Sequence, residues 1–170
     1  MSASNLDSDL AVAADLLEID STIEVSVVSG GASARFVTFF YGDNLYGLRA
    51  EEIAEVTHVL PISPLPNSPK LLCGIAPLRG EIVAVVDLRS LLQEATFTQH
   101  ARPKFVILRA AANETPIAFK VDCMHELVAA DEASYSPSTG TVSVLTGAAS
   151  VDGRSVGIIR GERIRAALGS

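Results

Sequence analysis

The chain has 170 residues, of which 48% are hydrophobic and 19% charged, and this balance excludes a wholly disordered protein. No apolar run reaches the roughly 20 residues that span a bilayer, and the first residues lack the basic and apolar segments of a secretory signal. The net charge is −7, but residues 1–34 contain six acidic residues and no Lys or Arg, so the remainder is close to neutral. Nucleic acid is therefore not an expected partner, because phosphate binding requires a basic surface.

Residues 1–34 are expected to form an acidic N-terminal extension. Within them Leu6, Leu10 and Leu17 recur at helical spacing, which fits either a flexible tail or an amphipathic helix docked on the body or on a partner. Ser29-Gly30-Gly31 then predicts a flexible joint before the body of the protein begins.

Short β-strands separated by turns are predicted from residue 36 onward. Runs of apolar and β-branched residues that predict strands occupy 36–40, 45–48, 53–59 and 82–86. Prolines between the third and fourth runs predict an ordered surface loop, and they are Pro61, Pro64, Pro66 and Pro69. Arg79-Gly80-Glu81 predicts a turn, and Asp87 is placed to cap a short helix at 88–92.

The same order of elements recurs after Pro103, which indicates an internal duplication. Residues 105–108 match 36–39 at an offset of 69, and Gly147 and Gly153 match Gly74 and Gly80 at an offset of 73. A lone core is marginal in copies of this size, so the two copies should share an interface. Many short strands with turn signals favour small closed barrels, which have no exposed sheet edges. The expected organisation is a first lobe at roughly 35–100 and a second at roughly 101–168.

Residue types that carry catalysis are not arranged in any catalytic pattern. The histidines His58, His100 and His125 have no partners at metal-ligand spacing. Cys123 lies two residues from His125, so a thiol–imidazole enzyme is one alternative, beside the interpretation of a buried Cys next to a surface His. A module that binds a small molecule between the lobes is another. No catalytic residue, cofactor or metal ligand is assigned, and the protein is not expected to be an enzyme.

Four stretches resemble the CheW-like family of bacterial chemosensory adaptors. They are Tyr46-Gly47-Leu48 with Ile53-Ala54-Glu55-Val56, the proline-spaced loop 61–69, the run 74–89 and its weaker counterpart 147–159. The run 74–89 is the most specific, because it contains Leu78-Arg79-Gly80 and Asp87-Leu88-Arg89. The resemblance covers about 35–168. Pro77 and Ala84 depart from it, since the family usually has Asn and Pro there, which bears on the geometry of the arginine turn and on the choice of partner.

The resemblance implies an all-β fold of two packed five-stranded β-barrels of the Src-homology-three type, with short helices and no enzymatic activity. It implies coupling of chemoreceptors to a CheA-type histidine kinase. One lobe would contact the kinase regulatory domain, and the cytoplasmic hairpin tip of the receptor would lie in the groove between lobes. Such a protein would be cytoplasmic, recruited to membrane-associated receptor arrays without inserting into the membrane. A diverged adaptor of a non-flagellar pathway, such as pilus motility, surface sensing or second-messenger signalling, is the alternative.

Partner-binding residues follow from the positions of the family motifs. They are Ile53, Glu55, Arg79, Gly80, Val83 and Val85. Glu55 and Arg79 are expected to form a partly exposed ion pair that fixes the arginine turn and orients the guanidinium toward a partner. A solvated pair that only aids folding is the alternative, and the three apolar residues fit either the core or the lining of the groove.

Overall fold

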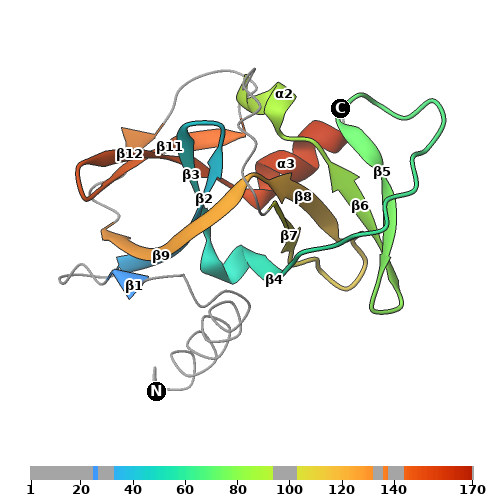
Figure 1. Ribbon diagram of the computed structural model, residues 1–170, viewed down its shortest axis with the longest axis horizontal. Coiled ribbons are helices and arrows are strands. Elements are labelled where there is room, and N and C mark those ends of the chain that lie inside the picture. Colours follow the sequence, from blue (N-terminus) through green and yellow to red (C-terminus); the bar gives the residue numbers. More distant parts are fainter. Residues whose placement is uncertain (1–24, 27–32, 94–102, 132–135, 138–143, 170) are drawn as a thin grey trace.

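A computed structural model describes residues 25–26, 33–93, 103–131, 136–137 and 144–169 of the chain (Figure 1). The strands are β1 (Val25–Ser26), β2 (Ser33–Tyr41), β3 (Asn44–Arg49), β4 (Ile53–Thr57), β5 (Leu72–Leu78), β6 (Glu81–Val86), β7 (Lys104–Leu108), β8 (Ile117–Val121), β9 (Cys123–Asp131), β10 (Ser136–Pro137), β11 (Leu145–Val151) and β12 (Arg154–Ile159). The helical segments are η1 (Ala50–Glu52), α2 (Arg89–Leu92) and α3 (Gly161–Leu168). The expected helix and glycine joint of the acidic extension fall in 1–24 and 27–32, outside the described residues.

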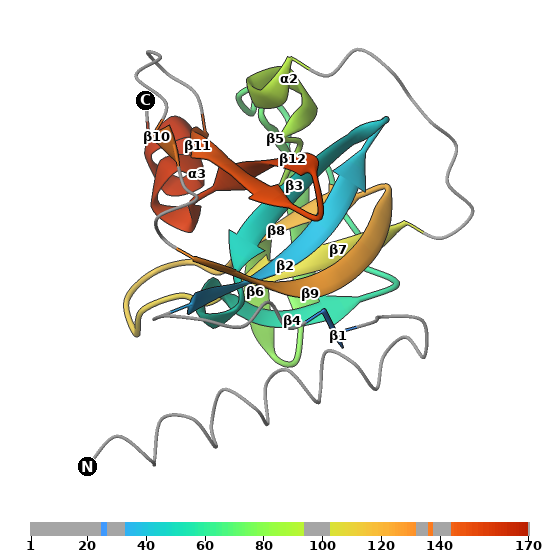
Figure 2. The ribbon, with the colours of Figure 1, turned by 90° about the vertical axis from the view of Figure 1, so that its left-hand side faces the viewer.

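The strands form two sheets that lie side by side. The first sheet has the order β1-β9-β2-β3-β12-β11-β10, in which the two-residue strands β1 and β10 flank five longer ones. The second sheet has the order β4-β7-β8-β6-β5. Figure 1 shows the first sheet at the left and the second at the right, and Figure 2 shows the first sheet in front. Two sheets that are each built on five main strands, with few helices, confirm the expected fold class.

Each sheet combines strands from both copies of the duplication. The equivalent pairs are β2 and β7, β3 and β8, β4 and β9, β5 and β11, and β6 and β12. Both sheets place these equivalents in the same order, with an antiparallel hairpin (β2–β3 or β7–β8) joined in parallel to the last strand of the other copy. The first hairpin of each copy therefore lies in the sheet built by the other copy. The expected division into lobes near residue 100 is wrong, because this exchange of hairpins interleaves the two sheets along the chain.

Both faces of the exchanged hairpins are buried, which explains their nearly continuous apolar sequences. On β2, Phe36 packs into the core of the first sheet, whereas Val37 and Phe39 join a larger core shared by both sheets. On β7, Phe105 packs into the core of the second sheet and Val106 into the shared core. Neighbouring strand residues point to opposite faces, so one apolar run fills two cores. The shared core makes the two sheets one body.

Two equivalent Ser-Pro segments cover sheet edges. Ser63 in the proline loop pairs with Ile75 of β5, with N-to-O distances of 2.8 and 3.0 Å. Ser136 of β10 pairs with Ala148 of β11. Ser63 and Ser136 differ by 73 residues, as β5 and β11 do, and this offset is a sequence signal that strand patterns alone did not reveal. The proline loop is thus an ordered surface loop, as expected.

Asp122 connects β8 to β9 and holds α2 of the other copy. Its carboxylate pairs with the guanidinium of Arg89 and accepts the backbone N–H of Gly42 at 2.8 Å. The side chains of Asp122 and Arg89 are only 5% and 13% exposed. As expected, Asp87 accepts the N–H of Arg89 at the start of α2, with an O-to-N distance of 2.9 Å.

Glu52 holds α3 in the reciprocal way. It lies directly before β4, as Asp122 lies directly before β9. One carboxylate oxygen is 2.7 Å from Nε of Arg160, and the other accepts the N–H of Gly161 at 2.6 Å, at the start of α3. Each copy therefore supplies the acidic residue that fixes the terminal helix of the other.

Tyr41 lies fully buried beside the Asp122–Arg89 pair, and its hydroxyl donates to the carbonyl of Lys120. Burial, and then the charge of Asp87, raise the pKa of Tyr41 well above its ordinary value of 10.0. Tyr41 then ionises near pH 10 only in the unfolded chain. The free energy of unfolding should therefore fall as pH rises above this value, by up to about 1.4 kcal/mol per pH unit.

Urea unfolding at about pH 9 and about pH 11 checks this expectation. The Tyr41→Phe variant keeps the packing of the ring and should lose this part of the pH dependence. Burial and the charge of Asp87 also raise the pKa of Cys73 from 9.0, so this thiol adds its own pH dependence to the free energy of unfolding. The protein with Tyr41 and the Tyr41→Phe variant should therefore both carry Cys73→Ser. An equal slope with and without the Tyr41 hydroxyl would contradict the assignment.

Candidate functional site

The turn between β5 and β6 presents an arginine in an unusual backbone conformation. Its central residues have positive φ angles, 50° at Arg79 and 86° at Gly80. A two-residue hairpin turn of type I′ requires positive φ at both positions, and its twist matches that of the strands. Glycine adopts this conformation freely, whereas at Arg79 it costs about 1–2 kcal/mol.

Arg79 forms the expected ion pair with Glu55. Nε of Arg79 is 2.8 Å from Oε2 of Glu55, and the two side chains are 79% and 23% exposed. Glu55 lies on β4 and Arg79 follows β5, so the pair joins the two edge strands of the second sheet. A pair this exposed contributes at most about 1 kcal/mol to stability. Its clearer effect is to fix the direction of a guanidinium that stays accessible.

The equivalent turn of the first sheet provides an internal comparison. Asp152 and Gly153 connect β11 to β12 with φ angles of 49° and 75°. The residue equivalent to Glu55 is Glu126, so acidic residues occupy both positions that form the ion pair in the second sheet. The same turn thus forms without an ion pair. The fold does not require Arg79 or its pairing with Glu55.

The apolar residues expected to bind a partner lie in the core. Ile53 is fully buried in the shared core, and Val83 and Val85 are 1% exposed in the core of the second sheet. Of the two roles expected for these three residues, core or groove lining, the structure places them in the core, because strand alternation turns them inward. The same alternation turns Ile82 outward, where it is 53% exposed. The sequence does not distinguish Ile82 from the buried valines, because all of them belong to one apolar run.

Pro77 faces Ile82 across the hairpin and is also exposed. Leu78 and Glu81 flank the two-residue turn as a hydrogen-bonded pair, so Pro77 and Ile82 form the next, non-hydrogen-bonded pair. The nitrogen of Pro77 therefore points away from the partner strand, at the edge of the sheet. Proline is tolerated at such a position because no ladder hydrogen bond is lost.

Cys123 and His125 contact different groups. The thiol of Cys123 donates to the carbonyl of Met124 at 3.1 Å. His125 Nε2 is 3.2 Å from the Glu126 carboxylate, and its ring lies 5.1 Å from that of Phe40. These contacts favour structural roles for both residues. Within the described ranges, no cluster of three or more His, Cys, Asp or Glu side chains could hold a metal ion.

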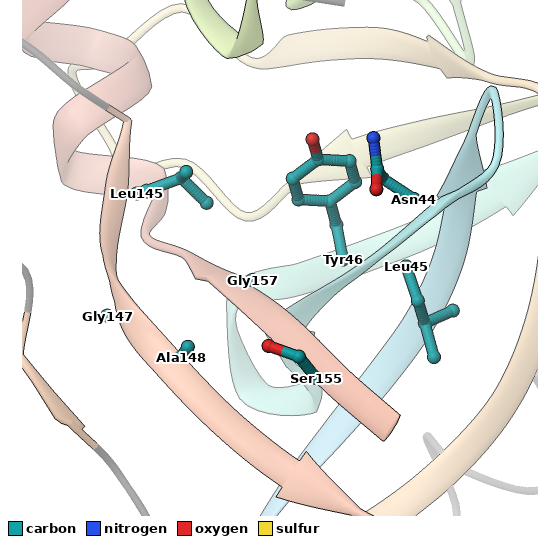
Figure 3. Close-up of a pocket in the computed structure, with 8 residues that line it drawn as sticks. All are labelled: Asn44, Leu45, Tyr46, Leu145, Gly147, Ala148, Ser155 and Gly157. Carbon is teal, nitrogen blue, oxygen red and sulfur yellow. The ribbon is translucent and has the colours of Figure 1, made fainter.

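A cavity of about 390 Å³ is lined by residues of β3, β11 and β12 in the first sheet (Figure 3). Its lining comprises Asn44, Leu45, Tyr46, Leu145, Gly147, Ala148, Ser155 and Gly157. Gly157 packs closely against Tyr46, since an added Cβ atom there would lie 2.9 Å from the ring. The cavity contains none of the expected partner-binding residues, and the space between the sheets is occupied by the shared core.

Comparison with known proteins assigns the chain to a family. The family model described as CheW-like domain matches residues 35–168. The chain belongs to the CheW-like family. A solved structure, that of the scaffolding protein TtCheW from Thermoanaerobacter tengcongensis, superposes with a TM-score of 0.67 at 27% identity and covers 75% of this chain and 88% of that one. The protein therefore belongs to a family of adaptors and scaffolds associated with chemotaxis.

Curated relatives of the CheW-like domain match over shorter stretches. Identity is 38% over 64 residues to chemotaxis protein CheW of Treponema pallidum (strain Nichols), covering 36% of this chain and 38% of that protein. It is 34% over 59 residues to protein FrzA of Myxococcus xanthus, covering 35% and 37%. It is 23% over 109 residues to chemotaxis protein CheW of Helicobacter pylori (strain ATCC 700392 / 26695), covering 64% and 65%. These matches span less than two thirds of each relative.

The departures of this CheW-like chain from the family pattern leave the hairpin intact. Pro77 keeps its place in the β5–β6 ladder, and Ala84 pairs with Ile75.

In the part of the chain that the structure describes, no helix has the length and apolar character needed to cross a membrane.

Proposed function

We propose that this CheW-like protein is a chemosensory adaptor that couples methyl-accepting chemoreceptors to a CheA-type histidine kinase by non-covalent scaffolding. The regulatory domain of the kinase and the cytoplasmic hairpin tip of the receptor bind at separate surfaces, the receptor at the Arg79 turn of the second sheet. The protein catalyses no reaction, works in the cytoplasm and is recruited to membrane-associated receptor arrays through these contacts.

The exposed guanidinium of Arg79 carries this proposal. It stands at a turn whose conformation is strained at Arg79, it is oriented by Glu55, and Gly80 beside it leaves open space, with no atom within 4 Å of an added Cβ. The equivalent turn of the first sheet has an aspartate there, so the arginine is not needed for folding. A planar guanidinium in a fixed orientation is suited to hydrogen-bond a carboxylate or carbonyl of a partner.

The fold supports an adaptor that passes a conformational bias between two partners. The shared core, Asp122 and Glu52 join both sheets into one body, so groups bound at two separate surfaces are held at a fixed separation. Coupling then depends only on the binding free energies at those surfaces. Weak single contacts suffice in an array, where neighbouring molecules raise the effective concentration of each partner.

Reversing the charge at Arg79 tests the proposed receptor surface. Arg79→Glu should weaken binding of a purified receptor hairpin fragment by about tenfold or more, because it removes the guanidinium and sets two carboxylates against each other. Arg154→Glu changes the same charge beside the equivalent exposed turn of the first sheet and should leave binding within about twofold. Calorimetric titration measures both, and receptor-coupled kinase activity should fall in parallel.

Normal receptor binding and kinase coupling by a folded Arg79→Glu protein would show that the turn is not the receptor surface. The kinase that co-purifies with the wild-type protein identifies the pathway. A kinase of flagellar chemotaxis supports the proposal as stated, and a kinase of pilus motility, surface sensing or second-messenger signalling supports the alternative pathway.

A further inference from the structure

We infer that Pro77 and Ile82 form an aliphatic step that selects the receptor, by accepting an aliphatic side chain next to the carboxylate that engages Arg79. This inference rests on the proposed function and adds a specificity determinant to it. The occupant is the receptor hairpin segment, and its required chemistry is an aliphatic residue flanked by an acidic one.

The first argument is that two neighbouring apolar side chains are exposed to solvent. Ile82 is 53% exposed, and it faces Pro77, also exposed, across a non-hydrogen-bonded pair of the β5–β6 hairpin. Side chains of such pairs approach closely, so the two form one continuous apolar patch. Exposed apolar patches beside polar groups often mark interaction sites.

The second argument comes from the duplicated hairpin of the first sheet. There the residues equivalent to Pro77 and Ile82 are Ser150 and Ser155, both exposed. The hairpins share strand pairing and turn geometry, with β11 and β12 antiparallel in the equivalent register. Exposed apolar residues at these positions are therefore not a requirement of the fold. The two hairpins differ in their surface chemistry, as they do at Arg79 and Asp152.

The third argument is that the apolar patch adjoins the positive charge of Arg79 on the same hairpin. Arg79 follows Pro77 by two residues and precedes Ile82 by three, on the hairpin that carries the proposed receptor surface. Its guanidinium is 79% exposed, whereas the Glu55 carboxylate that orients it is 23% exposed, so a partner meets the positive group first. Glu81 is exposed beside it and favours a basic group farther along the same partner segment.

Binding of the full-length chain to two purified partners tests the inference. The partners are the cytoplasmic hairpin fragment of a chemoreceptor and the regulatory domain of a CheA-type kinase, both from the same genome. Ile82→Asp should weaken binding of the receptor fragment by about tenfold or more, and Pro77→Ser by about threefold, while kinase binding stays within about twofold. Ser155→Asp is the matched control at the equivalent position and should leave both affinities within about twofold.

The outcomes separate this inference from the proposed function. If Arg79→Glu weakens receptor binding but Ile82→Asp and Pro77→Ser do not, the aliphatic step is wrong and the receptor surface stands. If Ile82→Asp weakens kinase binding instead, the step contacts the kinase and the inference is also wrong. If the wild-type chain does not bind the receptor fragment, the proposed function itself fails. Thermal melts of each variant show that folding is retained, as the exposure of both residues leads us to expect.

Discussion

Replacing Asp122 by Ala should lower the free energy of unfolding by about 3–5 kcal/mol, the effect of removing one partner of a buried ion pair. The substitution removes the Asp122 carboxylate that pairs with the guanidinium of Arg89, whose side chain is 13% exposed, and with it the acceptor of the Gly42 N–H. It also releases α2 from the point where the chain crosses from one sheet to the other. Chemical denaturation monitored by circular dichroism measures the loss.

Asp43→Ala is the matched control, because Asp43 is an exposed acidic residue next to Gly42 in the same turn. Its effect should stay within about 0.5 kcal/mol. Once Asp122 is replaced, adding Arg89→Ala should cost less than it does in the wild-type protein, since the partner is already gone. Additive effects of the two substitutions would mean that the pair does not hold α2.

Gly74→Ala should destabilise the protein by about 3 kcal/mol, summing overpacking with the loss of two backbone hydrogen bonds. Gly74 has a φ of +151°, and an added Cβ would lie 2.3 Å from the carbonyl oxygen of Ser63. That oxygen accepts the N–H of Ile75 at 3.0 Å, and Ser63 donates back to Ile75 at 2.8 Å. The methyl group would therefore push the proline loop off the edge of β5.

Gly153→Ala separates crowding from backbone strain. Gly153 also has a positive φ, 75°, but nothing lies within 4 Å of an added Cβ. Its loss of stability should be about 1 kcal/mol, the cost of the left-handed backbone conformation alone. Faster hydrogen exchange at Ser63 and Ile75 in Gly74→Ala, and not in Gly153→Ala, would show that the loop has detached. Equal destabilisation by both substitutions would refute the crowding argument.

The strands and the arginine turn could be predicted from the sequence because they depend on local patterns. Arg79 and Gly80 have positive φ angles, which fit the turn predicted at Arg79-Gly80-Glu81. The apolar runs at 36–40 and 82–86 lie within β2 and β6. The inward orientation of Val83 and Val85 could not be fixed, since an uninterrupted apolar run does not show which face of the strand is outside.

The exchange of hairpins could not be predicted from those patterns, because equivalent strands would bury the same residues in either arrangement. The length of the link between β8 and β9 decides between the exchanged and the unexchanged arrangement. Only Asp122 separates β8 from β9, so Val121 and Cys123 have Cα atoms at most about 7.6 Å apart. If β9 paired with β7 of its own copy, it would lie two strand spacings from β8, about 9.6 Å. The link is too short, and β9 must enter the other sheet.

This interleaving sets the order in which the protein can assemble as it leaves the ribosome. The strands of the second sheet have all been synthesised once β8 is complete, whereas the first sheet waits for β12 near the end of the chain. The hairpin β2–β3 is made first and finds its final neighbours last. During that interval the outer edges of the hairpin remain unpaired and prone to aggregation, a demand on nascent-chain chaperones that separate, sequential barrels would not make.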